Sequence, residues 1–340
     1  MPWASPRLVP LLLYRRALAN HNRRAAPLME EESMITTLRF TPTWLAAGLF
    51  VLAGCGDKTP KQVSAKEPGA PEPTVSVASE STPAPAEPVS VNTAPVSFET
   101  AEAAFRERRY GDAVRDFTAY TADRPGNAWG FYMLGLSSWK AGDFTTAEEA
   151  LRQALSIDPT HVKSYLNLSR VLLDAGQPDS AIAVLDTVLK IDDSLGEAYR
   201  LIGRAHDAKG ERDEAVTAYH EALVLDSTDV WAMNNLGHTL IVQGAYDEAL
   251  RPLARAVELV PEVAMFQNNL GIALERTGHF TLAAEAYRAA LAADSGFTKA
   301  SVNLQRVETL TEDPNIPPVD LKSLAQEFVQ QISSWANAGE

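Results

Sequence analysis

The chain has 340 residues, of which 46% are hydrophobic and 22% charged, and its formal net charge is −14 at pH 7. This acidity argues against binding to nucleic acid, whose phosphates attract basic surfaces. The single cysteine excludes a disulfide framework within one chain and a metal site built from several thiolates.

The N-terminal part ends in an apolar run just before Cys55. Residues 44–52 are too few to cross a bilayer as a helix, which needs roughly 20 residues, but they suit the core of a signal peptide. The ending LAGC at 52–55 resembles the lipobox of bacterial lipoproteins, and this resemblance implies that Cys55 is lipidated. The alternative is a lone buried cysteine, but the proline-rich sequence that follows offers nothing to pack against.

These features predict three N-terminal segments. We expect 1–33 to be an over-extended gene start, 34–54 to be the signal peptide beginning at Met34, and 55–96 to be a tether. The tether is rich in Pro, Ala, Ser and Glu, a composition that cannot bury enough apolar surface to fold. The lipoprotein resemblance implies a protein of the cell envelope that faces the periplasm. Gly56 after the cysteine favours the outer over the inner membrane, by analogy with enteric bacteria.

From residue 94 the sequence repeats itself every 34 residues, in six rows that end at 297. The twentieth place of every row is alanine, namely Ala113, Ala147, Ala181, Ala215, Ala249 and Ala283. The eighth place is small, as in Gly135, Ser169, Gly203, Gly237 and Gly271. The fifteenth is glycine in rows two to six, and the twenty-fourth is bulky, namely Phe117, Leu151, Leu185, Tyr219, Leu253 and Tyr287. Such a period predicts a repeat architecture.

Each row predicts a helix–turn–helix. Its first half has helical apolar spacing and stops at a glycine that can close a helix. The small eighth and twentieth places let the two backbones approach, and the bulky twenty-fourth fills the space between them. One pair cannot bury its apolar face alone, so the rows are expected to stack.

The rows resemble the tetratricopeptide repeat family. The resemblance is carried by the Leu-Gly pairs at 134/135, 236/237 and 270/271, the six alanines, the bulky residue four places later and the prolines at 125, 159 and 261. It implies an all-α fold, a right-handed solenoid of six repeats at 94–297 with C-terminal capping helices after a disordered tether. The first row departs from the pattern, because it lacks the Leu-Gly pair and the turn glycine.

Two further segments follow the rows. Residues 298–311 begin a seventh row that fails at a proline-rich stretch, and 319–337 predict an amphipathic helix. We expect this helix to cap the open apolar end of the solenoid, as such arrays require. The alternatives are a docking or dimerisation helix, or one that folds into the protein's own groove.

The asparagines of the first helices suggest a binding site. In the family, the stripe that carries them lines a concave groove, and some members use an asparagine ladder to hold an extended peptide. The resemblance therefore implies a grip on peptide backbone, since a side-chain amide both donates and accepts. The groove residues expected on this basis are Asn167, Arg170, Arg200, Arg204, Asn234, Asn235, His238, Asn268, Asn269, Arg276, Asn303 and Arg306. The alternative is that the asparagines only bond neighbouring helices.

The arginines of this stripe favour a partner segment with carboxylates, although they could also merely solubilise the helices. Trp129 and Trp231 either stack on a ligand or, as we favour, pack against the preceding row. No phosphate loop, zinc spacing or nucleophile motif is present, so we expect no enzyme, no cofactor and no metal.

We therefore expect a membrane-anchored scaffold that binds an extended protein segment in its groove and touches the membrane only through its lipid. The competing hypothesis is a structural lipoprotein that assembles through its outer surface or its last helix. A homo-oligomer is one form that this assembly could take.

Overall fold

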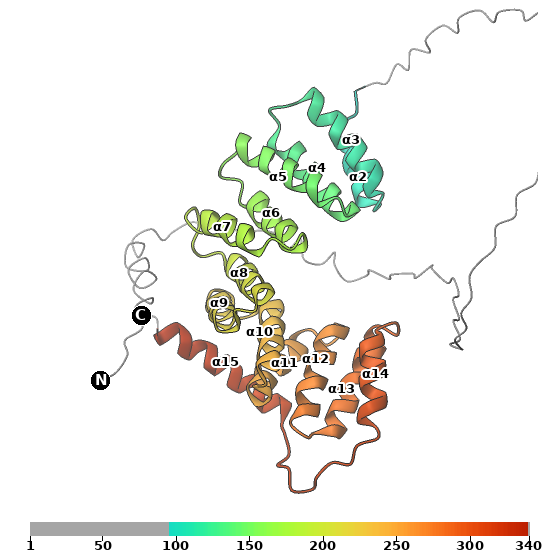
Figure 1. The fold of residues 1–340 in the computed structure, drawn as a ribbon, viewed down its shortest axis with the longest axis vertical. Helices are drawn as coiled ribbons and strands as arrows, with labels where there is room; N and C mark the ends of the chain where they lie inside the picture. The colour runs from blue at the N-terminus through green and yellow to red at the C-terminus, as the bar shows by residue number, and fades with distance from the viewer. Residues whose placement is uncertain (1–94, 339–340) are drawn as a thin grey trace, which may run out of the picture. The chain divides into compact units, whose positions relative to one another are not determined.

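The computed structural model describes residues 95–338, all within one compact unit, Pro85–Glu340. The expected gene-start segment, the signal peptide, Cys55 and nearly all of the tether lie outside the described residues. Within 95–338 the chain is built of α-helices and contains no strand (Figure 1). The predicted all-helical repeat fold is confirmed.

The helices follow the 34-residue period in pairs. The first helices of the six rows are α2 (Phe98–Arg106), α4 (Ala128–Ala141), α6 (Val162–Asp174), α8 (Gly196–Lys209), α10 (Val230–Gln243) and α12 (Ala264–Arg276). The second helices are α3 (Tyr110–Asp123), α5 (Phe144–Ile157), α7 (Pro178–Val188), α9 (Arg212–Leu225), α11 (Tyr246–Leu259) and α13 (Phe280–Ala293). Two more helices follow, α14 (Thr298–Val307) and α15 (Leu321–Ala338).

The small eighth place and the bulky twenty-fourth place meet inside each pair. A Cβ atom added to Gly135 would lie 2.6 Å from Cγ of Leu151, and one added to Gly203 would lie 2.5 Å from the ring of Tyr219. These distances are shorter than real contacts allow. Glycine at the eighth place is therefore what lets the two helices of a row approach this closely.

The fifteenth place closes the first helix of each row. Its glycines in rows two to six have φ between 73° and 88°, the left-handed conformation that ends a helix without a Cβ clash. The first row reaches the same conformation without glycine, because Arg108 has φ 60°. It is the one non-glycine residue with positive φ in the described part of the chain. The first row thus has the same turn as the other rows, although its sequence lacks the turn glycine.

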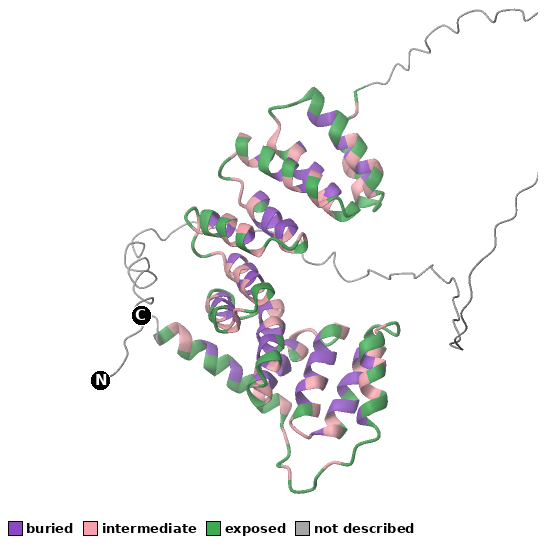
Figure 2. Cartoon of the chain, viewed as in Figure 1, coloured by how far each residue is buried: buried purple, intermediate pink, exposed green. Residues whose placement is uncertain are grey.

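The two layers of helices pack differently. Each first helix contacts the first helix of the next row, from α2·α4 through to α12·α14. In the described residues no two second helices contact each other. The stack therefore curves with the first helices on its inner side and the second helices on its outer side. Figure 2 shows the buried residues concentrated where neighbouring helices meet.

The last helix does not lie where the sequence predicted. α15 contacts α9 and α11, the second helices of rows four and five, and contacts neither α13 nor α14. Ala325, Phe328 and Ile332 are buried in this contact, and the ring of Trp335 stacks on His220 at 3.8 Å between centroids. The expected cap over the open end is therefore wrong. The helix covers the outer side of the middle of the stack instead.

Candidate peptide-binding face

We call the exposed side of α4, α6, α8, α10, α12 and α14 the inner face. The predicted groove residues all lie on these helices. The face divides into two halves of different chemistry, α4–α8 and α10–α14.

The asparagines of the second half form a hydrogen-bonded chain across three helices. Asn303 Nδ2 donates to Asn268 Oδ1 at 3.0 Å, and Asn269 Nδ2 donates to Asn234 Oδ1 at 2.9 Å. Within α12 and α10, Asn268 donates to Asn269 and Asn234 donates to Asn235, both at 3.4 Å. The chain therefore joins α14, α12 and α10 along the inner face.

This arrangement corrects the predicted ladder. Asn234, Asn268 and Asn269 are buried, and their amides bond neighbouring asparagines rather than facing solvent. Asn235 and Asn303 are half-exposed. Among the described residues, the amide nitrogen of Asn235 and the amide oxygen of Asn303 have no protein partner. These two groups, at opposite ends of the chain, are the donor and acceptor left for a ligand.

Asn167 belongs to a separate contact in the first half. Its Nδ2 donates to Tyr132 Oη at 3.2 Å and to the carbonyl of Lys163 at 3.0 Å, while its Oδ1 accepts from Arg170 at 2.9 Å. It is buried and joins α6 to α4. The prediction that it grips a peptide is therefore wrong in this structure, and the alternative of bonding between helices holds for it.

The basic residues of the first half are paired within the protein. Arg170 bonds Glu197, and Arg200 Nε donates to Asp229 Oδ2 at 2.8 Å with both side chains nearly buried. Arg204 lies 3.5 Å from Asp174, a residue that also accepts from Trp139. Arg170 and Arg204 thus pair across rows three and four, and Arg200 pairs with the N-cap residue of α10, so their charges are mostly neutralised. Asp229 is the last residue of its row and lies outside the stripe used to predict the groove residues.

One lysine stands beside this network. Lys140 lies over the ring of Trp139, 4.3 Å from its centroid. Partial burial lowers the pKa of Lys140, and the nearby positive charge of Arg170 lowers it further. The first half is thus crowded with cations that already have partners, and it offers little free charge to a ligand.

The second half presents exposed apolar side chains. Val242, Met265 and Val302 are exposed by 49%, 36% and 55%, although they lie on three successive first helices. They occupy the thirteenth, second and fifth places of their rows, which belong to the stripe predicted to face the groove. The search for asparagines and cations overlooked them, and the same helical spacing would have found them.

The polar residues of this half have divided roles. Arg306 bonds Glu275 through two contacts of 2.7 Å, so it joins α14 to α12. Burial raises the pKa of Glu275, but hydrogen bonds from Arg306 and Tyr287 outweigh this effect and hold it below its usual value. His238, Arg276 and Lys299 are exposed on α10, α12 and α14.

The two tryptophans at the second place pack against aromatic rings. Trp231 lies 5.1 Å from Phe266, edge to face, and Trp129 lies 4.8 Å from Tyr132. Trp129 nevertheless keeps 41% of its surface exposed. Both rings therefore pack within the protein, but Trp231 packs against the following row and Trp129 within its own row, so neither contact is the predicted one with the preceding row.

The described residues hold no group of three or more His, Cys, Asp or Glu side chains placed to bind a metal ion. A search of the same residues for helices long and apolar enough to cross a membrane found none.

Helix pairs that repeat every 34 residues and stack row upon row define the class of helical-repeat proteins. Family models described as Tetratricopeptide repeat match residues 98–162, 138–205, 198–230 and 234–296. Together these matches span more than half of the 340 residues. The chain belongs to the tetratricopeptide repeat family.

Solved structures share the fold at low sequence identity. The pilus biogenesis factor PilW is 20% identical, with 62% of this chain and 96% of that chain covered at a TM-score of 0.54. A chain of the Cut9–Hcn1 complex of APC/C is 16% identical, with 74% and 57% covered at 0.51. MamA from Desulfovibrio magneticus RS-1 is 21% identical, with 47% and 91% covered at 0.43. No curated protein matches the chain.

Proposed function

We propose that this protein is a scaffold that holds an extended segment of a partner protein on the α10–α14 half of its inner face. The observation that carries the proposal is the exposure of Val242, Met265 and Val302 on one face beside two half-exposed asparagines. Apolar side chains at this exposure suit contacts with partner side chains. The free amide groups of Asn235 and Asn303 suit its backbone, which needs both a donor and an acceptor.

The partner segment is expected to carry carboxylates. Arg276 and Lys299 are exposed cations on the same half of the face, whereas Arg306 is already bonded to Glu275. The whole chain is acidic, with a net charge of −14, so a local basic site would orient an acidic segment towards this half.

The proposal places the scaffold at the cell envelope, on the periplasmic side and preferably at the outer membrane. Its support is the sequence LAGC ending at Cys55, followed by a proline-rich tether. Replacing Cys55 with serine is expected to move the protein from the membrane fraction to the soluble fraction. Retention of the Cys55→Ser protein in the membrane fraction would contradict lipid anchoring.

The binding site is tested by photo-crosslinking in cells. A benzophenone amino acid in place of Met265 is expected to give defined adducts, identified by mass spectrometry, and Val302→Asp is expected to abolish them. The matched control places the same crosslinker at Val329, an exposed residue of α15 on the outer side. The same adducts from both positions, or adducts unaffected by Val302→Asp, would contradict a partner on the inner face.

The competing structural role would use the outer surface or the last helix. Because the last helix packs Phe328 and Ile332 against its own chain, we favour the inner face over assembly through that helix. The outer surface is the other place through which a structural lipoprotein could assemble.

A further inference from the structure

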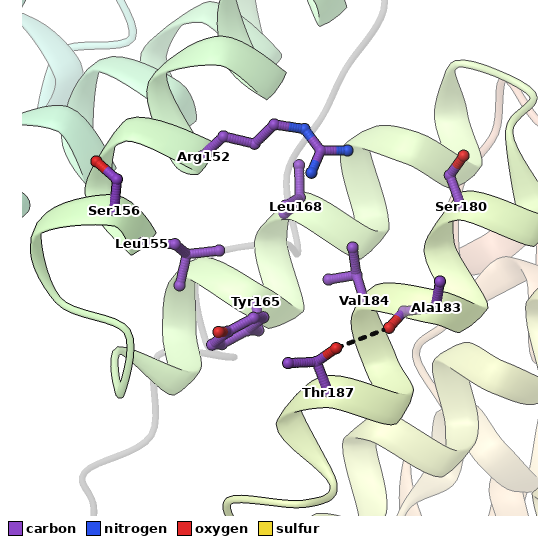
Figure 3. A pocket seen from close by; sticks show the side chains of 9 residues that line it. All are labelled: Arg152, Leu155, Ser156, Tyr165, Leu168, Ser180, Ala183, Val184 and Thr187. Atoms are coloured by element: carbon purple, nitrogen blue, oxygen red, sulfur yellow. Dashed lines mark hydrogen bonds between the residues drawn. The ribbon is translucent and has the colours of Figure 1, made fainter.

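Two equivalent surfaces on the outer side of residues 95–338 differ in that one is covered by α15 and the other is open. The open one lies between α5 and α7 over α6 and has a volume of about 500 Å³ (Figure 3). Leu155, Tyr165 and Val184 line it, with Arg152 and Ala183 at its edge. We call it the α5–α7 groove. The same surface two rows further along lies between α9 and α11, and α15 occupies it.

The correspondence between the two grooves is residue by residue. Advancing two rows takes Leu155 to Leu223 and Val184 to Pro252. Leu155 and Val184 are half-buried, whereas Leu223 and Pro252 are buried. The α5–α7 groove therefore has an apolar floor with Ser156, Ser180 and Thr187 among its lining residues, and it lacks the cover that its equivalent has.

The edges of the filled groove show how a helix is held there. His220 stacks on Trp335, and Arg251 Nε donates to Glu327 Oε2 at 3.2 Å. The places of His220 and Arg251 are taken in the open groove by Arg152 and Ala183. An arginine also stacks on aromatic rings. The open groove thus has a residue that can stack on an aromatic ring, Arg152, but no residue that can form the ion pair made by Arg251.

The apolar pattern of the bound helix is simple. Phe328, Ile332 and Trp335 are spaced by four and three residues, so they lie on one side of α15. Phe328 and Ile332 keep only 1% and 4% of their surfaces exposed, so α15 already has its place. Within residues 95–338 no further helix packs on the outer side of α5 and α7.

We propose that the α5–α7 groove binds an amphipathic helix of a partner protein. That helix has large apolar residues with the spacing of Phe328, Ile332 and Trp335, and its aromatic residue stacks on Arg152. The side chain of Arg152 is 52% exposed and held by Glu148 at 2.8 Å, so it is available for stacking and already oriented.

The test uses the full chain and a fluorescent peptide with the sequence of residues 319–338. Because the chain's own α15 fills the α9–α11 groove, added peptide has the α5–α7 groove open to it. We expect saturable binding of one peptide per chain, weakened at least tenfold by Val184→Glu. Ala183→Arg recreates the position of Arg251 and is expected to tighten binding about threefold, an increase lost when the peptide carries Glu327→Gln.

Two controls keep the test decisive. Thr217, which is exposed, occupies the place of Ala183 one row further along, so Thr217→Arg is expected to leave binding unchanged. Ala183 is also exposed, so the arginine variant reports on the groove even where Val184→Glu impairs folding.

Absence of binding, or binding insensitive to both groove variants, would overturn the proposal. Sedimentation of the full chain tests a further outcome. If the chain forms dimers that Ala183→Arg or Val184→Glu disrupts, the groove binds a second copy of the chain and the proposal of a partner helix is overturned.

Discussion

In each row the residue type at the twenty-fourth place correlates with the residue type at the twelfth place. Tyr219 Oη donates to Asp207 Oδ2 and Tyr287 Oη donates to Glu275 Oε2, both at 2.8 Å. Rows with phenylalanine or leucine at the twenty-fourth place have an apolar twelfth, namely Phe105, Trp139, Leu173 and Ile241. A hydroxyl is thus placed in this buried contact only where a carboxylate accepts from it. Burial raises the pKa of Tyr287, which keeps it a donor.

The left-handed residue of the first row gives a stability prediction. Arg108 has φ 60°, a conformation that costs a non-glycine residue of order 1 kcal/mol. Arg108→Gly is therefore expected to raise the free energy of unfolding by up to about 1 kcal/mol. Denaturant titration checks it. The reverse change, Gly176→Ala, meets no atom within 4 Å and is expected to destabilise by a similar amount through the backbone alone. An unchanged or lower stability of Arg108→Gly would show that other contacts of the arginine outweigh the strain.

Two substitutions in the asparagine chain are expected to separate an asparagine that stabilises the fold from one that binds the partner. Asn269→Ala removes a 2.9 Å bond between helices and leaves the buried amide oxygen of Asn234 without its donor, so we expect a loss of about 1–2 kcal/mol. Asn235→Ala removes a half-exposed amide and one long bond of 3.4 Å from Asn234, so stability is expected to change by less than about 0.5 kcal/mol while crosslinking to the partner falls. Thermal unfolding and the Met265 crosslink measure the two effects. Equal loss of stability in both variants would mean that Asn235 is structural too.

The asparagines also show where reasoning from the sequence ends. Helical spacing predicts correctly that Asn235 and Asn269 share a stripe, because spacing fixes the direction of a side chain around its helix. It cannot predict that Asn269 donates to Asn234 of the row before, since that depends on the rotation between rows. The pair of Arg200 with Asp229 likewise depends on how α10, which Asp229 caps, packs against α8.

At the scale of the element, α15 is the part of the fold that the sequence predicted in kind but not in place. Its apolar stripe predicts correctly that Phe328 and Ile332 are buried. A stripe does not identify the surface that buries it. The choice of α9 and α11 depends on the groove between them and on the segment 308–320, which bonds back to the stack through His279 and Pro317 at 3.0 Å.

The contact of α15 with His220 predicts a dependence on pH. Burial lowers the pKa of His220 to about 4, below its ordinary value near 6.5. The unfolded chain therefore binds this proton more readily, so the contribution of a neutral His220 is complete above about pH 6.5 and is lost as the pH falls towards 4. The loss is at most on the order of 3 kcal/mol. Hydrogen exchange of α15 at pH 7.5 and 5.0 is expected to show faster opening at the lower pH.

The matched control for this effect is His220→Phe, which keeps a ring against Trp335 but cannot take up a proton. Other carboxylates titrate in both proteins, so only the difference between them reports on His220. An equal change in α15 exchange with pH in the two proteins would assign the effect to other groups.

At the scale of the whole molecule, the core of residues 95–338 divides into buried clusters, and half-buried Leu173 packs against two of them. One buried cluster runs through rows one to three, and a larger one runs from row four to α15. Between them lies a small cluster of Leu166, Leu185, Val188, Ala198 and Leu201. Since each row of a solenoid is stabilised mainly by its neighbours, the two large clusters can differ in stability. α15 adds burial only to the second of them.

We therefore expect the array to open unevenly, with the amides of α10–α13 exchanging more slowly than those of α2–α5. Phe328→Ala removes a side chain that is 1% exposed, so it is expected to lower protection in α9–α12 by about 3 kcal/mol and to leave α2–α5 unchanged. The control Val329→Ala lies on the exposed side of the same helix, 38% exposed, and is expected to change neither region. Hydrogen exchange with mass spectrometry resolves the regions. An equal loss from α2 to α13 would mean that the rows unfold as one unit, and the small cluster between rows three and four would then transmit stability rather than divide it.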